Sequence, residues 1–341
     1  MNDARSTEAP IGPPAEDDTP QVQAKPAGAR RLLHILGALV VVVVLPALLM
    51  AALVGELGVA ALLTGLLLGA TGAKLSGARR MLYVAPLLGL AGGLGAYTAY
   101  DWWWVALLAT AGVIAGAGSG FGWLPALLMV PFASTFVTPV STAEDAVIYG
   151  VILAIGALYG IVIARRFGVP DVVDGEHYAP PVAATVTIVF GIVMAASAAV
   201  GVALGWTEPY WVPEPVLILV LYILMGKRDR IRGKAIGTAL GIAAAIPVAL
   251  ASPPPAVLTA VGGVAFLIAL TQAKTYWLMY GLYTFSVVLL LAAPGQVGFE
   301  AEERGFQIFV GIGLLIVGLA VVHALGSRLA RSHPQPELAP S

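Results

Sequence analysis

The sequence predicts an all-α membrane protein with about twelve transmembrane helices, arranged as two parallel six-helix repeats. The 341 residues are 59% hydrophobic and only 11% charged, and their mean hydropathy is +0.90. A soluble globular domain carries roughly 25% charged residues, so this chain has little polar surface to present to water. Long apolar runs and a one-sided distribution of lysine and arginine favour the same conclusion.

The apolar runs predict the individual helices, since a span needs roughly 20 mostly apolar residues. In the first half they lie at residues 32–53, 57–73, 80–99, 103–120, 123–140 and 144–164. In the second half they lie at residues 181–205, 212–226, 232–251, 256–272, 275–293 and 304–327. Very short turns join several of them, so neighbouring helices are expected to be antiparallel. The runs are too long and too rich in alanine, leucine and glycine for barrel strands.

Polar segments divide the chain into five parts. Residues 1–30 are rich in proline, alanine and acid and lack an apolar run, which predicts a disordered cytoplasmic tail and excludes a signal peptide. The first six-helix repeat covers 31–166 and the second covers 181–329, with a polar cytoplasmic linker at 167–180. A short cytoplasmic tail is expected at 330–341.

The positive charges predict the orientation. With both tails in the cytoplasm, 17 of the 18 Lys and Arg residues face inward and only Arg304 faces outward, in agreement with the positive-inside rule. Acidic residues show no such asymmetry. Those expected on the outer side are Glu56, Asp101, Glu144, Asp145, Glu208, Glu214, Glu300, Glu302 and Glu303. An even number of spans fits this distribution.

The two halves share a pattern of loops. A basic inner loop precedes a glycine-rich helix in each half, KLSGARR at 74–80 and MGKRDRIRGK at 225–234. Each last helix follows an outer acidic step, at 142–145 and at 299–304. Because each unit has an even number of helices, both have the same orientation. The repeat is therefore parallel, with its axis along the membrane normal.

The second half carries a set of residues that resembles a known family. These residues are Tyr210-Trp211 before an apolar helix, Arg228-x3-Arg232-x4-Gly237-Thr238-x2-Gly241, the helix from Tyr276 to Thr284, and Glu303-Arg304 opening the last helix before Gly311. In them the chain resembles the fusaric-acid-resistance-like (FUSC) family. That family includes aromatic acid exporters and looks distantly related to plant aluminium-activated malate transporters.

The resemblance implies a transporter in the bacterial cytoplasmic membrane that exports aromatic or other amphipathic organic anions. Two alternatives stay open. The first is an anion channel on the same fold, favoured by the scarcity of acids within the apolar runs. The second is a membrane scaffold that does not transport, with the tails as docking segments. The expected partners are the organic anion and membrane lipids, and a homodimer is a further expectation.

The basic cluster at 227–234 is the main candidate site for an anion. Arg228 and Arg232 are four residues apart, so they share a helix face. Cations at a helix N-terminus oppose the helix dipole, and an anion bound to the free N–H groups and both arginines would remove this conflict. Three alternatives remain: topology with lipid headgroup contact, anion recruitment at the mouth of a pathway, and pairing with acids of the same protein.

Other candidate residues follow from the same interpretation. Anion recruitment is also predicted for Lys234, Thr238, Lys274, Lys74, Arg79 and Arg80. Pathway residues are predicted at Thr284, Gly237 and Gly241, although glycines at four-residue spacing also allow helices to pack closely. Proton coupling is predicted for Glu303, Glu144 or Asp145, although acids at a helix start are also ordinary helix-terminal residues.

Several classes of function are not expected. The sequence has no Ser/His/Asp set, no H-E-x-x-H and no P-loop, so an enzyme is not predicted. No cysteine is present and the four histidines are scattered, so neither a metal site nor a cofactor is expected. The net charge of −1 gives no reason to expect nucleic acid binding.

Overall fold

The computed structural model describes residues 43–173, 175–227, 229–251, 253–272, 275–291 and 297–332. The chain divides into two compact units, Met1–Pro46 and Ala47–Ser341. Of the first unit, only residues 43–46 are described, where helix α2 (Leu45–Val54) begins. The predicted tail 1–30, the start of the predicted span 32–53 and most of the tail 330–341 lie outside the described residues.

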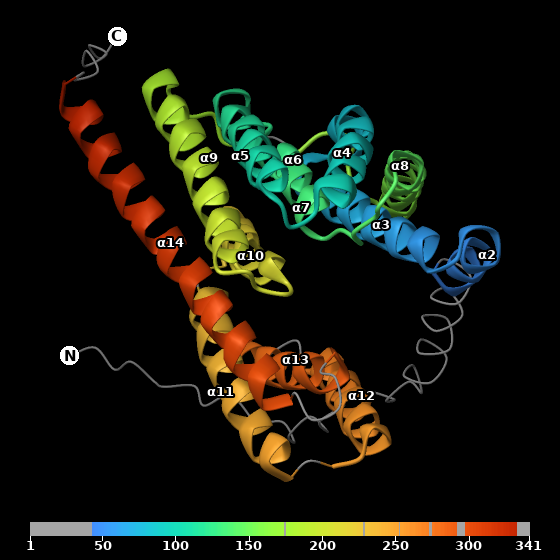
Figure 1. Cartoon of the computed structure of the whole chain (residues 1–341). Helices are drawn as coiled ribbons and strands as arrows, with labels where there is room; N and C mark the ends of the chain where they lie inside the picture. The colour runs from blue at the N-terminus through green and yellow to red at the C-terminus, as the bar shows by residue number, and fades with distance from the viewer. Residues whose placement is uncertain are drawn as a thin grey trace, which may run out of the picture. The chain divides into compact units, whose positions relative to one another are not determined.

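The first half of the second unit is helical (Figure 1). Its elements after α2 are α3 (Glu56–Ser76), α4 (Ala78–Thr98), α5 (Trp102–Ala117), the 3-10 helix η2 (Gly118–Phe121), α6 (Leu124–Leu127), α7 (Met129–Thr135) and α8 (Ala143–Arg166). Side-chain caps begin two of the long helices: Asp101 accepts hydrogen bonds from the backbone N–H groups of Trp103 and Trp104, and Thr142 caps α8.

The second half is also helical. Its elements are α9 (Pro180–Ala203), the 3-10 helix η3 (Pro209–Trp211), α10 (Pro213–Leu224), α11 (Asp229–Ala251), α12 (Pro255–Thr271), α13 (Tyr276–Leu291) and α14 (Val297–Ser332). Proline opens α9, α10 and α12, where its missing N–H leaves no intrahelical bond unmade. The described residues contain no β-strand, so the predicted all-α class is confirmed.

Glycine allows the main helix pairs to pack closely. In the first half, α3 and α4 both pack against α8, and Gly65 and Gly69 of α3 lie against the backbone of Leu153 and Ala157. In the second half, α11 and α12 pack against α13, while α14 contacts α9, α10 and α11. The pair α5 and α9 joins the two halves. Such small-residue contacts supply dispersion energy where lipid provides no hydrophobic drive.

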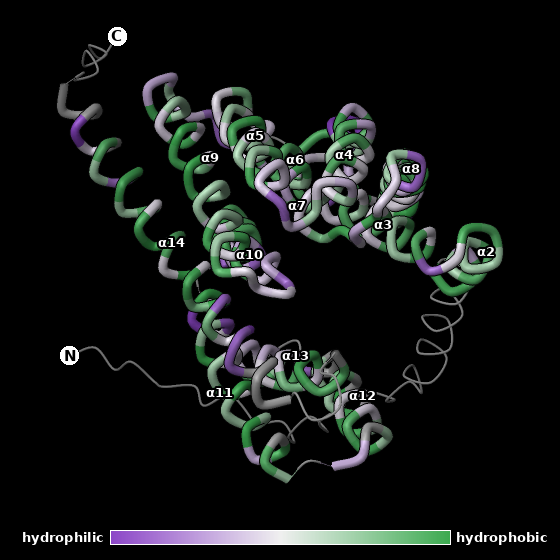
Figure 2. The backbone as a smooth tube through the Cα atoms, viewed as in Figure 1, coloured by the Kyte–Doolittle hydropathy of each residue, from purple (hydrophilic) through white to green (hydrophobic). Residues whose placement is uncertain are grey.

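The outward faces of the helices are apolar. Exposed side chains include Leu67 at 64%, Trp103 at 74% and Ile316 at 60%. Figure 2 shows α9 and α14 as hydrophobic over most of their length. Apolar surface on this scale is typical of a face that contacts a membrane or a partner. These helices support a multi-pass membrane protein.

Seven of the described helical segments are long and apolar enough to cross a membrane: 56–76, 78–98, 102–121, 143–166, 180–203, 230–248 and 302–325. They match seven of the predicted spans. The remaining described apolar helices are shorter, at 45–54, 124–135, 209–224, 256–266 and 276–290. The count of twelve spans and the two-repeat arrangement therefore stay predictions.

The predicted single helix at 123–140 is wrong. The segment forms two short helices, α6 and α7, and the chain leaves helical geometry after Thr135. Pro131 cannot donate the backbone hydrogen bond that would continue the first helix into the second. Pro139 follows in the non-helical part. Residues of α7 and of the non-helical part after it line the two cavities described below.

Candidate functional site

Helix α11 presents basic residues on two different faces. Arg230, Lys234 and Thr238 follow at four-residue spacing and share one face, and Lys234 and Thr238 are only 3% and 1% exposed. Arg232 is exposed. Arg228, the other predicted anion ligand, lies outside the described residues. On α11, the described basic side chains that point into the protein are therefore those of Arg230 and Lys234.

Lys234 forms a buried ion pair with Glu214 in the first turn of α10. Nζ of Lys234 lies 2.7 Å from Oε1 of Glu214, and the two side chains are 4% and 8% exposed. The topology prediction placed Glu214 on the outer side and Lys234 on the inner side, and this contact shows that the separation is wrong. The reason is the length of α10, whose 12 residues span only about 18 Å.

Tyrosine rings surround the two cations. The guanidinium carbon of Arg230 lies 3.9 Å from the ring centroid of Tyr276 and 5.5 Å from that of Tyr222. Nζ of Lys234 lies 5.4 Å from the ring centroid of Tyr280. The hydroxyls of Tyr222 and Tyr280 are in hydrogen-bond contact. Cation–π contacts strengthen when water is excluded, so these residues hold α10, α11 and α13 together.

A cavity of ≈ 420 Å³ lies beside this ion pair, and we call it the Glu214 cavity. Five aromatic side chains line it together with Glu214: Phe132, Phe136, Trp211, Tyr222 and Tyr283. Oε2 of Glu214 is buried and has no hydrogen-bond partner among the described residues. A buried acceptor without a donor is costly. The cavity size falls in the range of about 300–1,000 Å³ that is usual for ligand pockets.

Glu208 and Arg304 form a second ion pair. Nη2 of Arg304 lies 2.9 Å from Oε2 of Glu208, and the same oxygen accepts a 2.9 Å hydrogen bond from Nε1 of Trp211. The guanidinium carbon lies 5.2 Å from the ring centroid of Trp211, and Nη1 donates to the carbonyl oxygen of Val287 at 3.2 Å. Arg304 is 3% exposed, so it is a buried cation held by η3, α13 and α14.

A second cavity, of ≈ 320 Å³, lies beside Glu208, and we call it the Glu208 cavity. Tyr100 and Tyr210 line it, with their rings stacked at a centroid distance of 6.2 Å. Thr64 and Phe136 line both cavities. The cavities therefore share a wall, and each is lined by the carboxylate of one ion pair.

The predicted pathway residues lie in a helix contact. A Cβ atom added to Gly241 would meet Cβ of Thr284 at 2.9 Å and the backbone of Gly281, and one added to Gly237 would meet the backbone of Trp277. Gly237, Gly241, Thr238 and Thr284 are not among the residues that line the two cavities. The glycines allow α11 and α13 to pack closely.

Arg80 holds two loops together. Its Nη1 donates to the carbonyl oxygens of Gly122 at 2.9 Å and Val173 at 2.7 Å. Its guanidinium carbon also lies 6.0 Å from the ring centroid of Trp123. This predicted anion ligand therefore fastens the start of α4 to the loop after η2 and to the linker between the halves.

The basic loops of the two halves lie near one another. Lys74 and Arg79 are exposed, at the end of α3 and the start of α4. Burial, followed by the positive charges of Arg230 and Lys74, lowers the pKa of Lys227. Lysines from both halves thus contribute to one positive field. Lys274, the predicted counterpart of Lys74, lies outside the described residues.

The acids predicted for proton coupling have local hydrogen bonds. Asp145 accepts a 2.7 Å hydrogen bond from the hydroxyl of Thr142, and its backbone N–H donates to that hydroxyl at 3.0 Å. Glu144 is exposed in the same turn. Glu303 accepts a 2.8 Å hydrogen bond from Nε2 of Gln307. None of these three acids is among the residues that line the two cavities.

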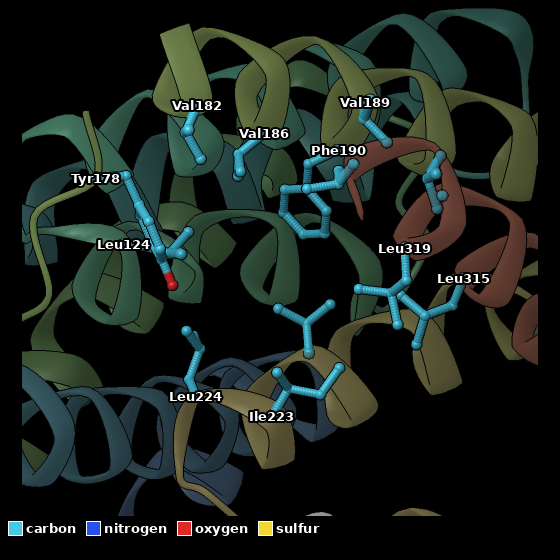
Figure 3. A pocket seen from close by; sticks show the side chains of 14 residues that line it. Leu124, Tyr178, Val182, Val186, Val189, Phe190, Ile223, Leu224, Leu315 and Leu319 are labelled. Carbon is cyan, nitrogen blue, oxygen red and sulfur yellow. The ribbon is translucent and has the colours of Figure 1, made fainter. Parts of the chain in front are cut away.

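A third cavity, of ≈ 200 Å³, is almost wholly apolar. Figure 3 shows side chains of α9, α10 and α14 around it, among them Val186, Phe190, Ile223, Leu315 and Leu319. Tyr178 supplies a hydroxyl at one side (Figure 3). None of the described residues that line it is charged, so it offers no group to bind the charge of an anion.

Sequence reasoning missed Glu214, Glu208 and Arg230 as site residues. A signal existed for Arg230, since it has helical spacing with Lys234. A signal also existed for Glu214, which stands between two prolines at the start of an apolar run, where an ionisable residue is itself a functional indication. The pairing of Glu208 with Arg304 joins residues 96 positions apart, and no local pattern indicates it.

Comparison with known proteins assigns the second half. Residues 194–318 match the family model described as fusaric acid resistance protein-like. The match begins within α9 and ends within α14, so it includes both ion pairs. No curated protein and no solved structure gives a significant match to the chain. The match over residues 194–318 supports an assignment of this part of the chain to the fusaric acid resistance protein-like (FUSC) family.

Proposed function

We propose that the chain is a membrane transporter that exports aromatic or other amphipathic organic anions from the cytoplasm. The observation that carries this proposal is the pair of adjoining cavities, each lined by aromatic rings and by the carboxylate of an ion pair whose cation is buried. Ionisable residues buried among membrane helices usually mark a substrate or ion pathway. The family assignment supports a transport-related role in the same region.

The chemistry of the Glu214 cavity suits an aromatic carboxylate. Such a ligand has a flat ring and one negative charge. The rings of Phe132, Phe136 and Trp211 can pack against the ligand ring in offset or edge-to-face geometry. Lys234 does not itself line the cavity, but it is bonded to Glu214, which does, and it can bind the carboxylate through a charge-assisted hydrogen bond when Glu214 moves aside.

The proposed direction rests on the family resemblance and on the basic loops. Lys74, Arg79 and Lys227 create a positive field on one face, which raises the local concentration of anions. We place this face in the cytoplasm, with both termini, in a bacterial cytoplasmic membrane. Anions collected there would enter the protein near Arg230.

We also propose the twelve-helix arrangement as two parallel repeats. Equivalent helices make equivalent contacts in the two halves. In the first half α3 and α4 pack on α8, and in the second half α10 and α11 pack on α14. Likewise α4 and α5 pack on α7, and α11 and α12 pack on α13. This correspondence supports a repeat in which α2 to α8 matches α9 to α14, with α6 and α7 counted as one interrupted helix.

Transport of benzoate into everted membrane vesicles that contain the protein tests the function. Benzoate and cyclohexanecarboxylate have similar size and the same charge, but only benzoate has an aromatic ring. We expect everted vesicles to accumulate benzoate and to accumulate cyclohexanecarboxylate more weakly. The double variant Glu214→Gln/Lys234→Met removes both charges at nearly constant volume and should reduce benzoate accumulation by at least about tenfold, the effect of one lost interaction of about 1.4 kcal/mol.

A matched control is available in the exposed ion pair between Arg165 and Asp171. Its atoms lie 2.8 Å apart and its side chains are 51% and 57% exposed, so Arg165→Gln/Asp171→Asn should transport normally. Unchanged benzoate accumulation in the Glu214/Lys234 variant would exclude this site as the pathway. Single-channel currents carried by benzoate would favour the channel, and the absence of any anion flux would favour the scaffold.

A further inference from the structure

The Glu214–Lys234 pair is incomplete on the side of the carboxylate. Oε1 of Glu214 accepts a 2.7 Å hydrogen bond from Lys234. Oε2 has no hydrogen-bond partner among the described residues, although Glu214 is only 6% exposed and lines a cavity of ≈ 420 Å³. Lys234 is thus the single cationic partner shown for this carboxylate, and the charge of Glu214 depends on it.

A ligand carboxylate that binds Lys234 competes directly with Glu214. One ammonium group cannot neutralise two carboxylates in a dry site, and a buried charge that loses its partner is strongly unfavourable. A buried acid in that position takes up a proton, because the neutral form removes the desolvation cost. The protonated carboxyl group can then donate a hydrogen bond to a neighbouring acceptor.

We propose that an organic anion binds Lys234 by displacing Glu214, and that Glu214 takes up one proton as it is displaced. This coupling rests on the proposed function, because it assigns the substrate charge to Lys234 and the coupled ion to Glu214. The N–H···O bond from Lys234 to Glu214 breaks, a new one forms from Lys234 to the ligand, and the proton comes from water. Net charge at the site is unchanged, since one anion and one proton are bound together.

The ionisable groups around Glu214 are few. On α10 and α13 they are Tyr222, Tyr280 and Tyr283, and on α11 they are Lys234 and, one turn earlier, Arg230. The described helices α7 and α9, which also pack against α10, carry no ionisable side chain. On the side of η3 and α14 the ionisable groups are Tyr210 and Arg304, which is paired with Glu208, while Glu303 accepts a hydrogen bond from Gln307. Among the described residues that line the Glu214 cavity, Glu214 is therefore the one with a carboxyl group.

Calorimetry of benzoate binding to the purified full chain in detergent tests the coupling. Titrations at one pH in two buffers of different ionisation enthalpy give the number of protons bound per ligand. We expect one proton taken up per benzoate, and an affinity that rises about tenfold for each unit of falling pH over the range in which one proton is taken up. This measurement on the unmodified chain decides the proposal even if a variant fails to fold.

Two variants test which group takes up the proton and which group binds benzoate. Glu214→Gln should bind benzoate more tightly at neutral pH, without proton uptake and without the pH dependence. Lys234→Met should lose benzoate binding. Asp171→Asn, in the exposed pair with Arg165, should retain both affinity and proton uptake.

The outcomes separate the two proposals. Benzoate binding or transport with no proton uptake overturns the coupling and leaves the proposed function standing. Proton uptake that persists in Glu214→Gln places the proton elsewhere and also overturns it. If the unmodified chain neither binds nor transports benzoate, both proposals are rejected for this substrate class.

Discussion

Trp211 donates a hydrogen bond from its indole nitrogen to Glu208, with Nε1 and Oε2 2.9 Å apart. The same indole lines the Glu214 cavity. Trp211 thus contacts one ion pair through its polar edge and contributes an aromatic wall next to the other. Its neighbour Tyr210 lines the Glu208 cavity, so the two adjacent aromatic residues face different cavities.

We expect Trp211→Phe to destabilise the protein and to keep the wall of the Glu214 cavity. The phenyl ring retains apolar contact but loses the N–H donor, and a hydrogen bond to a charged group is worth about 1.5–3 kcal/mol. Thermal unfolding in detergent measures the loss. Trp103→Phe, at a ring that is 74% exposed, is the matched control and should unfold like the unmodified chain.

Gly241→Ala should separate α11 from α13. The added Cβ would meet Cβ of Thr284 at 2.9 Å and backbone atoms that cannot move aside, and such overpacking costs about 1–3 kcal/mol. Gly263→Ala is the control, because nothing lies within 4 Å of its added Cβ and alanine favours a helix by about 1 kcal/mol over glycine. We expect the thermal midpoint to fall in Gly241→Ala and to rise in Gly263→Ala. Equal shifts in the two variants would contradict the close packing of α11 and α13.

Lys227→Gln should stabilise the protein at neutral pH. The folded chain lowers the pKa of Lys227 through burial and through Arg230 and Lys74. Between the lowered pKa and the unfolded value of about 10.4, the unfolded chain holds a proton that the folded chain has released, so stability rises with pH there. Thermal midpoints measured across this window should rise in the unmodified chain and rise less in the variant. A variant that is no more stable than the unmodified chain at neutral pH would contradict the repulsion of Lys227 by Arg230 and Lys74.

The absence of cysteine from the sequence makes the topology directly testable. Single cysteines can be introduced without background and labelled with a membrane-impermeant maleimide in intact cells and in everted vesicles. We expect Arg232→Cys and Arg79→Cys to react in everted vesicles, and Glu144→Cys and Glu56→Cys to react in intact cells. Both groups reacting from the same side would exclude the proposed orientation.

Much of the fold is predictable because hydropathy and chain breaks are local properties. The helices 56–76, 78–98, 143–166 and 180–203 lie within a few residues of the predicted spans. The prediction fails at 123–140, because hydropathy alone does not register the backbone donor that Pro131 lacks. Pro86, in contrast, lies inside the unbroken helix α4. The prediction also misses the length of α14, whose polar first turns continue the helix.

The candidate site is less predictable because its residues come from separate segments. Helical spacing on α11 already distinguishes the face of Arg230 and Lys234 from that of Arg232. The partner of Lys234 depends on how short α10 is, and the sequence indicates this only through Pro213 and Pro215. Thr64 and Phe136 come from the first half and have no local feature that marks them as cavity residues.

Glu208 and Glu214 stand at the two ends of one seven-residue segment, which also contains Pro209 and Pro213. Proline fixes its own φ angle and restricts the residue before it, so this segment has little slack. The segment thus carries a carboxylate at each end, one paired with Arg304 and the other with Lys234. A displacement of either carboxylate would therefore reach the other through the backbone of this segment alone.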